Sequence, residues 1–306
     1  MDNILFDNFK YQNSILMHEH IFNIYPPSKK RVNTEFTLEL LNQLDAYKVK
    51  YIVDLTPYTN VDRYLDIVDA SPLPIICCIG FLYGKYLTTR DKRKSEDEIY
   101  TQMRQQYTIG LGKRKIQPCL IKIATNTNEI KDYERHFFSA AIKLSNEYDI
   151  PIAFYCPFNT FFNYIELLRI GINPTLLMIC HYENQYKRVA SQEFERQAKM
   201  IASNGAYIQL SDFGTKPNSP KSKSILSLFR YLTMSGYSSQ LLLSSDCSWT
   251  WINGQPKLKS GNMNLGYKYL FEYTIPLLAE NGIDQQVIAN VLAKNSRLFL
   301  RIGEEE

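Results

Sequence analysis

Short apolar runs alternate along this chain with longer segments in which apolar residues recur at helical spacing. The runs number eight and lie at 14–17, 51–55, 74–79, 119–124, 151–154, 176–180, 206–210 and 240–244. Several are apolar at nearly every position, which is typical of strands that are buried on both faces because helices cover the outside of a parallel sheet. The alternation predicts repeated strand–helix units around a parallel sheet, so the fold class we expect is α/β, a (β/α)8 barrel.

The segments between the runs indicate how the chain is organised. Segment 134–148 has its apolar residues on one side of a helix, and Asp284 precedes another apolar stripe as a predicted N-cap. No Gly/Ser linker or charge block divides the sequence, which favours one barrel domain over residues 1–306. Segments 81–96 and 247–264 are long and would overhang the mouth of a barrel as loops.

Composition narrows the class of protein. The chain has 306 residues, 45% hydrophobic and 22% charged, and a net charge of +4 that is too weak and diffuse for a nucleic-acid partner. Its longest uncharged stretch, 150–165, is interrupted by prolines and asparagines and is too short to span a membrane. The six cysteines have no CxxC spacing, and residues 1–7 carry acids where a secretory signal has bases, so we expect a cytoplasmic protein.

Candidate metal ligands follow the predicted strands. Three of the four histidines, His18, His20 and His181, come directly after apolar runs, as does Asp246. Side chains two apart on a strand point to the same side, so His18 and His20 can bind one metal ion. The fourth, His136, lies within a predicted helix and is interpreted as structural.

Lys122 interrupts the apolar run Leu120-Ile121-Lys122-Ile123-Ala124, and a buried ammonium needs a partner or must lose its proton. One interpretation is a buried ion pair between Lys122 and Asp246. The other is a neutral amine that captures carbon dioxide, giving a carbamate able to bridge two divalent cations. Burial alone leaves both open.

These motifs together resemble the phosphotriesterase-like family of the amidohydrolase superfamily. The residues that carry the resemblance are His18-Glu19-His20, Val53-Asp54-Leu55, Ile121-Lys122-Ile123, Cys180-His181 and Ser245-Asp246, in order over about residues 10–300. The resemblance implies a distorted TIM (β/α)8 barrel of the metal-dependent hydrolase type, with two divalent cations, most often zinc. It implies that His18, His20, Asp246 and carbamylated Lys122 hold the first cation, and that Lys122 and His181 hold the second.

One position departs from the family pattern, because Tyr155 stands where a fifth-strand histidine is expected. The phenol could bind a cation as a phenolate, or stay neutral and hydrogen-bond to water. The second cation site could instead be empty, which would make the centre mononuclear or the protein an inactive, ligand-binding descendant.

The resemblance implies hydrolysis of a lactone or carboxylic ester, such as a sugar lactone or its phosphate, by metal-activated hydroxide with Asp246 as proton acceptor. Asp246, Lys122 and Tyr155 are therefore the expected catalytic residues. On the mouth loops we expect Tyr83, Lys85, Trp249 and Trp251 to contact a small-molecule substrate, although for the lysine solvated loop charge is the favoured interpretation. The sequence is compatible with a homodimer, and we expect no membrane partner.

Overall fold

The computed structural model describes residues 11–21, 33–57, 61–258 and 264–303. Residues 1–7, which bore on the expected location of the protein, lie outside the described residues, as do residues 259–263 of the second predicted mouth loop.

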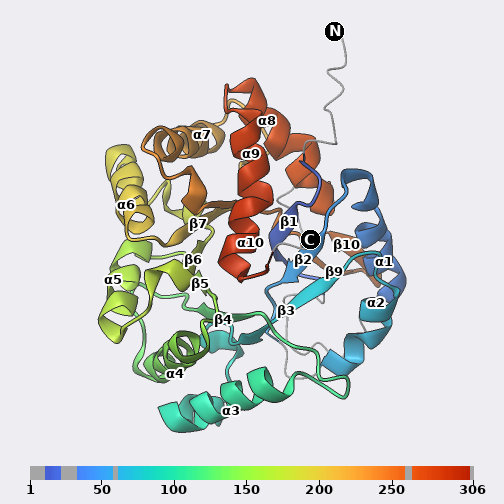
Figure 1. The fold of residues 1–306 in the computed structure, drawn as a ribbon, viewed down its shortest axis with the longest axis vertical. Helices are drawn as coiled ribbons and strands as arrows, with labels where there is room; N and C mark the ends of the chain where they lie inside the picture. The colour runs from blue at the N-terminus through green and yellow to red at the C-terminus, as the bar shows by residue number, and fades with distance from the viewer. Residues whose placement is uncertain (1–10, 22–32, 58–60, 259–263, 304–306) are drawn as a thin grey trace.

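Eight strands follow one another round a parallel sheet in their order along the chain. They are β1 (Ile15–Glu19), β2 (Tyr51–Asp54), β3 (Ile75–Gly80), β4 (Leu120–Ala124), β5 (Ile152–Tyr155), β6 (Leu177–Cys180), β7 (Tyr207–Leu210) and β8 (Leu241–Leu243). The sheet curls until β8 lies beside β1, and helices surround it (Figure 1). All eight predicted strands and the TIM-barrel fold class are confirmed.

Helices follow the strands and cover the outside of the sheet (Figure 1). The first seven are α1 (Thr34–Asn42), α2 (Leu65–Ala70), α3 (Glu96–Ile109), α4 (Asp132–Tyr148), α5 (Thr160–Ile170), α6 (Ser191–Ser203) and α7 (Pro220–Met234). In α4 the apolar side predicted from segment 134–148 is buried against the sheet. No helix in the described part of the chain is long and apolar enough to cross a membrane.

The last helix closes the end of the barrel at which the strands begin. After a π-helical turn (Leu270–Thr274) come α8 (Ile275–Glu280), α9 (Gln285–Leu292) and α10 (Lys294–Leu300). Asp284 caps α9 by accepting hydrogen bonds from the backbone N–H groups of Gln286 and Val287, which confirms the predicted N-cap. Phe299 of α10 packs within the apolar interior of the barrel, its ring centroid 5.0 Å from that of Tyr207, the first residue of β7. The other end of the barrel is therefore the one that carries the mouth loops.

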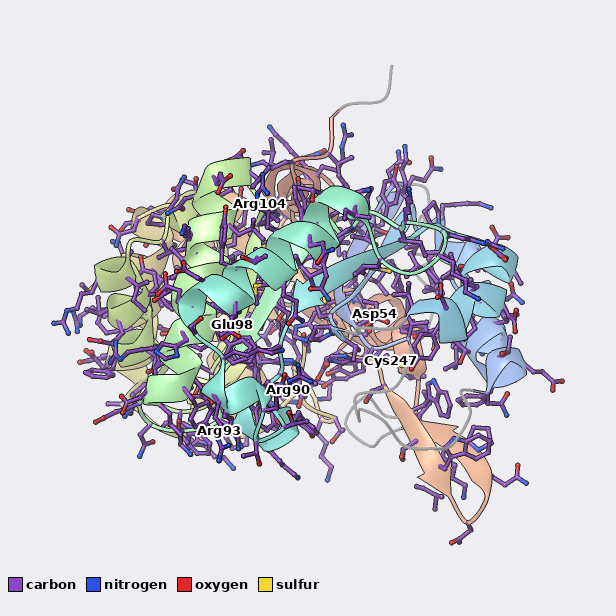
Figure 2. All side chains as sticks on the ribbon, turned by 90° about the horizontal axis from the view of Figure 1, so that it is seen from below. Asp54, Arg90, Arg93, Glu98, Arg104 and Cys247 are labelled. Atoms are coloured by element: carbon purple, nitrogen blue, oxygen red, sulfur yellow. The ribbon has the colours of Figure 1, made fainter. Side chains whose placement is uncertain are left out.

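One mouth loop contains more structure than the sequence predicted. Within segment 247–264 the strands β9 (Trp249–Ile252) and β10 (Gln255–Leu258) form an antiparallel hairpin. Its two turn residues, Asn253 and Gly254, both have positive φ, as a tight hairpin turn requires. In Figure 2 the hairpin and the segment carrying Arg90 and Arg93, which follows β3, project at the same end of the barrel.

Candidate metal centre

The predicted metal ligands come together where the strands end. His18 and His20 lie at the end of β1, His181 directly follows β6, and Asp246 lies in the segment after β8. All three imidazoles point at one carboxylate. The Nε2 atoms of His18 and His20 lie 3.9 and 3.3 Å from Asp246 Oδ1, and the Nε2 atom of His181 lies 3.4 Å from Asp246 Oδ2.

The other ring nitrogen of each imidazole is engaged by an oxygen atom. The Nδ1 atom of His18 lies 3.2 Å from Gln209 Oε1, that of His20 lies 2.7 Å from Thr56 Oγ1, and that of His181 lies 3.1 Å from Glu183 Oε1. Carboxylate and amide oxygens accept, so the Nδ1 atoms of His18 and His181 carry the proton. Their Nε2 atoms are then left as free electron-pair donors, which is the tautomer that a metal-binding histidine needs.

The electrostatics of His18 agree with a neutral imidazole. Burial lowers the pKa of His18 well below its ordinary value, and the nearby charge of Lys122 lowers it further. Burial also lowers the pKa of His20, although Asp246 opposes the shift. For Asp246 itself burial acts upward, but His181, His20 and Lys122 outweigh it, so the pKa of the carboxyl is lowered and the group is ionised.

The pKa of His181 moves in the opposite direction. Burial acts to lower it, but the carboxylates of Asp246 and Glu183 together outweigh burial and raise it. The two acidic groups on either side of this ring thus make its nitrogen a stronger base than the nitrogens of the other two imidazoles.

A divalent cation fits this arrangement. Two atoms bound to zinc at about 2.1 Å in a tetrahedral geometry lie about 3.4 Å apart, close to the 3.3 and 3.4 Å that separate Asp246 from His20 and His181. One ligand atom each from His18, His181 and Asp246 lies within 4.8 Å of the others. Asp246 Oδ1 is buried and makes no hydrogen bond in the described part of the chain, so it is free to meet a cation.

Lys122 is buried within β4 and lies close to this cluster. Its Nζ atom donates a hydrogen bond to Cys180 Sγ at 3.4 Å and lies 5.6 Å from the centre of the Tyr155 ring. No ion pair within 4.0 Å joins Lys122 to Asp246 among the described residues, so the interpretation of Lys122 as a structural ion-pair partner of Asp246 does not match the geometry.

Tyr155 ends β5 and lies against the cluster, with its ring centroid 5.6 Å from that of His181 in an edge-to-face contact. Burial, with smaller contributions from Tyr83 and Asp246, raises the pKa of the phenol well above its ordinary value. The surroundings of Tyr155 therefore favour a neutral phenol over a phenolate.

Of the two substrate contacts expected on the loop after β3, Tyr83 lies near the cluster and Lys85 lies in solvent. Tyr83 is half-buried, with its ring centroid 6.3 Å from that of Tyr155, and thus borders the cluster. Lys85 is exposed and lies over the ring of Tyr86, the next aromatic residue along the same loop. These positions allow Tyr83 to contact a molecule bound at the cluster.

Trp249 does not match the expectation of a substrate contact. It is fully buried, its indole N–H donates to the carbonyl of Ile21 at 3.2 Å, and its ring packs against Phe36 and Trp251. The physical reason is that Trp249 begins β9 and anchors the hairpin to the barrel, whereas Trp251, two residues further, is half-buried.

Two buried carboxylates near the cluster were not predicted as site residues. Glu183 is completely buried, and its Oε1 atom accepts from the N–H groups of Ser211 and Asp212 as well as from His181. Glu19, between the two histidines of β1, is also completely buried. Burial raises its pKa to about 8, although three hydrogen bonds oppose the shift. The sequence offers a signal only for Glu19, whose charge interrupts a strand that is otherwise apolar apart from the ligands.

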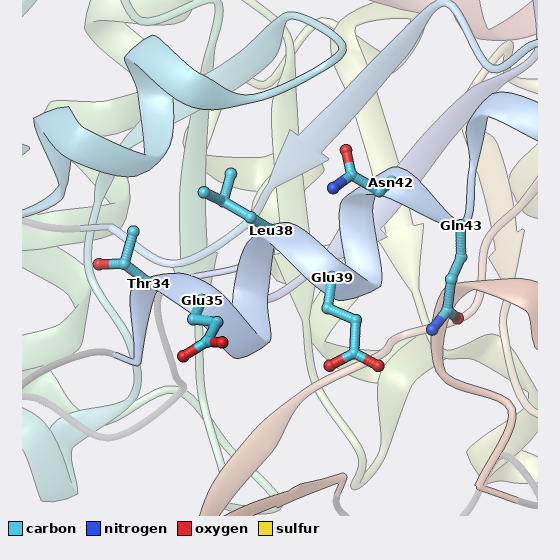
Figure 3. Close-up of a pocket in the computed structure, with 6 residues that line it drawn as sticks. All are labelled: Thr34, Glu35, Leu38, Glu39, Asn42 and Gln43. Atoms are coloured by element: carbon cyan, nitrogen blue, oxygen red, sulfur yellow. The ribbon is translucent and has the colours of Figure 1, made fainter.

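A groove elsewhere on the molecule is lined by none of the candidate metal ligands or their neighbours named above. It runs along one helix, α1, and is lined by Thr34, Glu35, Leu38, Glu39, Asn42 and Gln43 (Figure 3). Three of these side chains, Glu35, Glu39 and Asn42, are exposed. The groove therefore has no part in the metal centre.

The sequence of this chain is similar to known proteins along most of its length. The sequence model of the phosphotriesterase family matches residues 10–300. A relative named aryldialkylphosphatase, from Saccharolobus solfataricus, is 29% identical over 265 residues, which cover 83% of this chain and 81% of the relative.

Solved structures share the fold. The phosphotriesterase homology protein of Escherichia coli, crystallised with phosphate in its active site, has a TM-score of 0.79 at 18% identity, with 95% of this chain and 99% of that chain covered. A variant of a PTE-like lactonase from Deinococcus radiodurans has a TM-score of 0.77 at 24% identity, with 95% and 97% covered.

Proposed function

Because the chain belongs to the phosphotriesterase family, we propose that it is a metal-dependent hydrolase that opens a lactone or cleaves a carboxylic ester. A sugar lactone or its phosphate is the substrate type we favour. The observation that carries the proposal is the convergence of the Nε2 atoms of His18, His20 and His181 on the carboxylate of Asp246. The similarity to a PTE-like lactonase supports the ester-opening reaction.

The residues that would hold the first cation are His18, His20 and Asp246 together with Lys122, and those that would hold the second are Lys122 and His181. Zinc is the ion we expect, since imidazole and carboxylate ligands suit it. A cation bound here would polarise the ester carbonyl and lower the pKa of a water molecule.

The side chains then divide the proton transfers between them. The ionised carboxylate of Asp246 would accept the proton that the attacking water loses. Tyr155, kept neutral by burial, would donate a hydrogen bond from its phenol toward the water or the substrate. Tyr83 and Trp251 would contact the part of the substrate that lies in the mouth, and Lys85 would bind an anionic substituent.

Lys122 would act as a carbamate. The Lys122 nitrogen, once deprotonated, would attack the carbon of carbon dioxide. A C–N bond would form as one C=O π-bond becomes an oxyanion, and the nitrogen would release one proton to water. Protein equilibrated with ¹³C-labelled bicarbonate should give a carbamate signal in its ¹³C spectrum. The signal should be absent from Lys122→Ala, and its absence from the unaltered protein would contradict this role.

The experiment that tests the function compares two histidines. Unaltered protein should contain stoichiometric divalent metal and hydrolyse members of a lactone panel. His18→Ala should lower kcat/KM by about a hundredfold or more, since loss of a group that merely orients a ligand already lowers affinity or activity about 10–100-fold. His136→Ala is the matched control, because His136 lies in α4 and contacts the carbonyl of Lys94.

Tyr155 favours a second candidate function, a protein that binds a small ligand without converting it. Its phenol replaces a nitrogen ligand and is held neutral. Protein that contains no metal after incubation with excess zinc, yet binds a lactone tightly and unchanged, would establish this alternative and exclude the hydrolase.

A further inference from the structure

Glu19 lies between two metal ligands in the sequence but on the other face of the strand, since alternate side chains of a strand point to opposite sides. Its side chain is completely buried. A buried carboxylate needs hydrogen-bond donors around it, and those of Glu19 come from the opposite end of the chain.

Its donors bracket Asp246. Glu19 Oε1 accepts hydrogen bonds from Ser244 Oγ at 2.7 Å and from the backbone N–H of Ser245 at 2.8 Å, while Oε2 accepts from the backbone N–H of Cys247 at 2.6 Å. The N–H groups of the residues before and after Asp246 are thus held by one carboxylate.

Asp246 needs such support because of its backbone conformation. Its φ is +49°, in the left-handed region that residues other than glycine avoid at a cost of about 1–2 kcal/mol. A residue stays in this region only where the surrounding structure holds it there. The two N–H groups on either side of Asp246 are fixed by Glu19, and its own N–H donates to the carbonyl of His18 at 3.0 Å.

These contacts lie on the seam of the barrel. Among the described residues, hydrogen-bonded ladders join each strand to the next from β1 to β8, and none joins β8 back to β1. At the mouth the seam is bridged by the bonds to Glu19, by the N–H of His20 donating to the carbonyl of Cys247 at 2.9 Å, and by the N–H of His18 donating to Ser244 Oγ at 2.8 Å. The candidate ligands His18 and His20 stand on one side of this seam and Asp246 on the other.

We propose that Glu19 is a positioning residue that sets the Asp246 carboxylate relative to His18 and His20 across the barrel seam, and so determines the affinity and geometry of the cation site. This inference rests on the proposed function only in requiring that the cluster bind a cation. Glu19 does not touch the substrate or the cation and acts through the backbone around Asp246.

The test is Glu19→Gln, which keeps the shape of the side chain but replaces one acceptor oxygen with an amide NH2. That NH2 group would face a backbone N–H, so one flank of Asp246 loses its hydrogen bond. Glu134→Gln is the matched control, because Glu134 is equally buried and also accepts from two backbone N–H groups, those of Gly84 and Lys131, and one hydroxyl, that of Thr125.

Chelator-treated proteins are titrated with Zn²⁺ alone, and the visible absorption of the Co²⁺-loaded proteins reports ligand geometry. We expect Glu19→Gln to weaken Zn²⁺ binding by about 10–100-fold and to change the Co²⁺ spectrum. Glu134→Gln should lower the melting temperature, whereas its Zn²⁺ affinity and Co²⁺ spectrum should match those of the unaltered protein. Equal Zn²⁺ affinity and an unchanged spectrum in Glu19→Gln would overturn the proposal.

If the cluster does not bind a cation at all, the unaltered protein will bind no Zn²⁺. This outcome differs from one in which the unaltered protein and Glu19→Gln bind Zn²⁺ equally well. If Glu19→Gln does not fold, Ser244→Ala decides, since it removes the hydroxyl that joins Glu19 to the N–H of His18. Weaker Zn²⁺ binding with an altered Co²⁺ spectrum would support the proposal, and values equal to those of the unaltered protein would refute it.

Discussion

Two of the candidate ligands, His181 and Asp246, have left-handed backbones, with φ of 55° and 49°. Each sits beside a completely buried glutamate that accepts backbone hydrogen bonds from a neighbouring segment, Glu183 for His181 and Glu19 for Asp246. Unfavourable backbone conformations of this kind are characteristic of functional sites held by their surroundings. At this scale the orientation of a candidate metal ligand depends on buried glutamates that would not themselves contact the cation.

Glu183 gives a prediction that is independent of Glu19. In Glu183→Gln the amide oxygen can still accept a hydrogen bond from His181 Nδ1. Without the negative charge, however, the Nε2 atom of His181 becomes a weaker electron-pair donor to a cation. We expect Zn²⁺ affinity to fall about tenfold, measured by competition with a chromophoric chelator. Glu166→Gln, which alters a mostly buried glutamate paired with Arg135 and Arg169, should leave the affinity unchanged. Equal affinities in the two variants would show that Glu183 does not tune His181.

How far the sequence predicts such residues depends on where their partners lie. His18 and His20 are found from strand alternation, which is a local property. Two of the groups that orient the imidazoles, Thr56 and Gln209, reach them from the segment after β2 and from β7, and no local pattern marks them. Glu183 lies only two residues after the histidine that it orients, but the backbone N–H groups that hold it come from the segment after β7.

Among the secondary-structure elements, the strands were predictable because burial on both faces leaves a dense apolar run in the sequence. The hairpin β9–β10 was not predicted as strands, although its turn sequence Asn253-Gly254 is a local signal for one. The strands of the hairpin are short and half-exposed, so they leave no dense apolar run, and the burial of Trp249 depends on Phe36 and Ile21 from another part of the chain.

The contact between β3 and β4 provides an element-scale prediction. Gly80 ends β3 with a φ of +113°, and a Cβ atom there would lie 2.0 Å from the backbone oxygen of Lys122. Gly80→Ala must therefore push β3 away from the strand that carries Lys122. We expect it to lower the free energy of unfolding by about 2–3 kcal/mol, measured by urea denaturation.

Gly171→Ala separates this clash from the conformational effect. Gly171 also has a positive φ, of +105°, but a Cβ atom there would meet nothing within 4 Å. It should lower the free energy of unfolding by only about 1 kcal/mol. If the two alanine variants were equally destabilised, the close approach of Gly80 to Lys122 would not be the cause.

For the whole molecule, the barrel brings together groups from β1, β6 and the segment after β8, and α10 fills the opposite end. A cation held by ligands from such distant segments binds the folded state and not the unfolded chain. At a Zn²⁺ concentration 100 times its dissociation constant, the folded state should gain about 2.7 kcal/mol. For a chain of this length the melting temperature should rise by about 5 °C.

The measurement is differential scanning calorimetry of chelator-treated protein with and without Zn²⁺. Asp246→Asn, which removes the carboxylate on which the three imidazoles converge, should show a much smaller rise. A rise of the same size in Asp246→Asn would place the stabilising cation elsewhere.

The barrel seam also constrains how this protein can be made. His18 and His20 leave the ribosome before Asp246 and the backbone N–H groups that hold Glu19, which emerge only after β8. Until β8 and the segment after it have been translated, the nascent polypeptide carries an incomplete site, and Glu19 lacks the protein groups that donate to it in the folded barrel. Under the proposed function, the complete ligand set can therefore hold a cation only after the eighth strand has been translated.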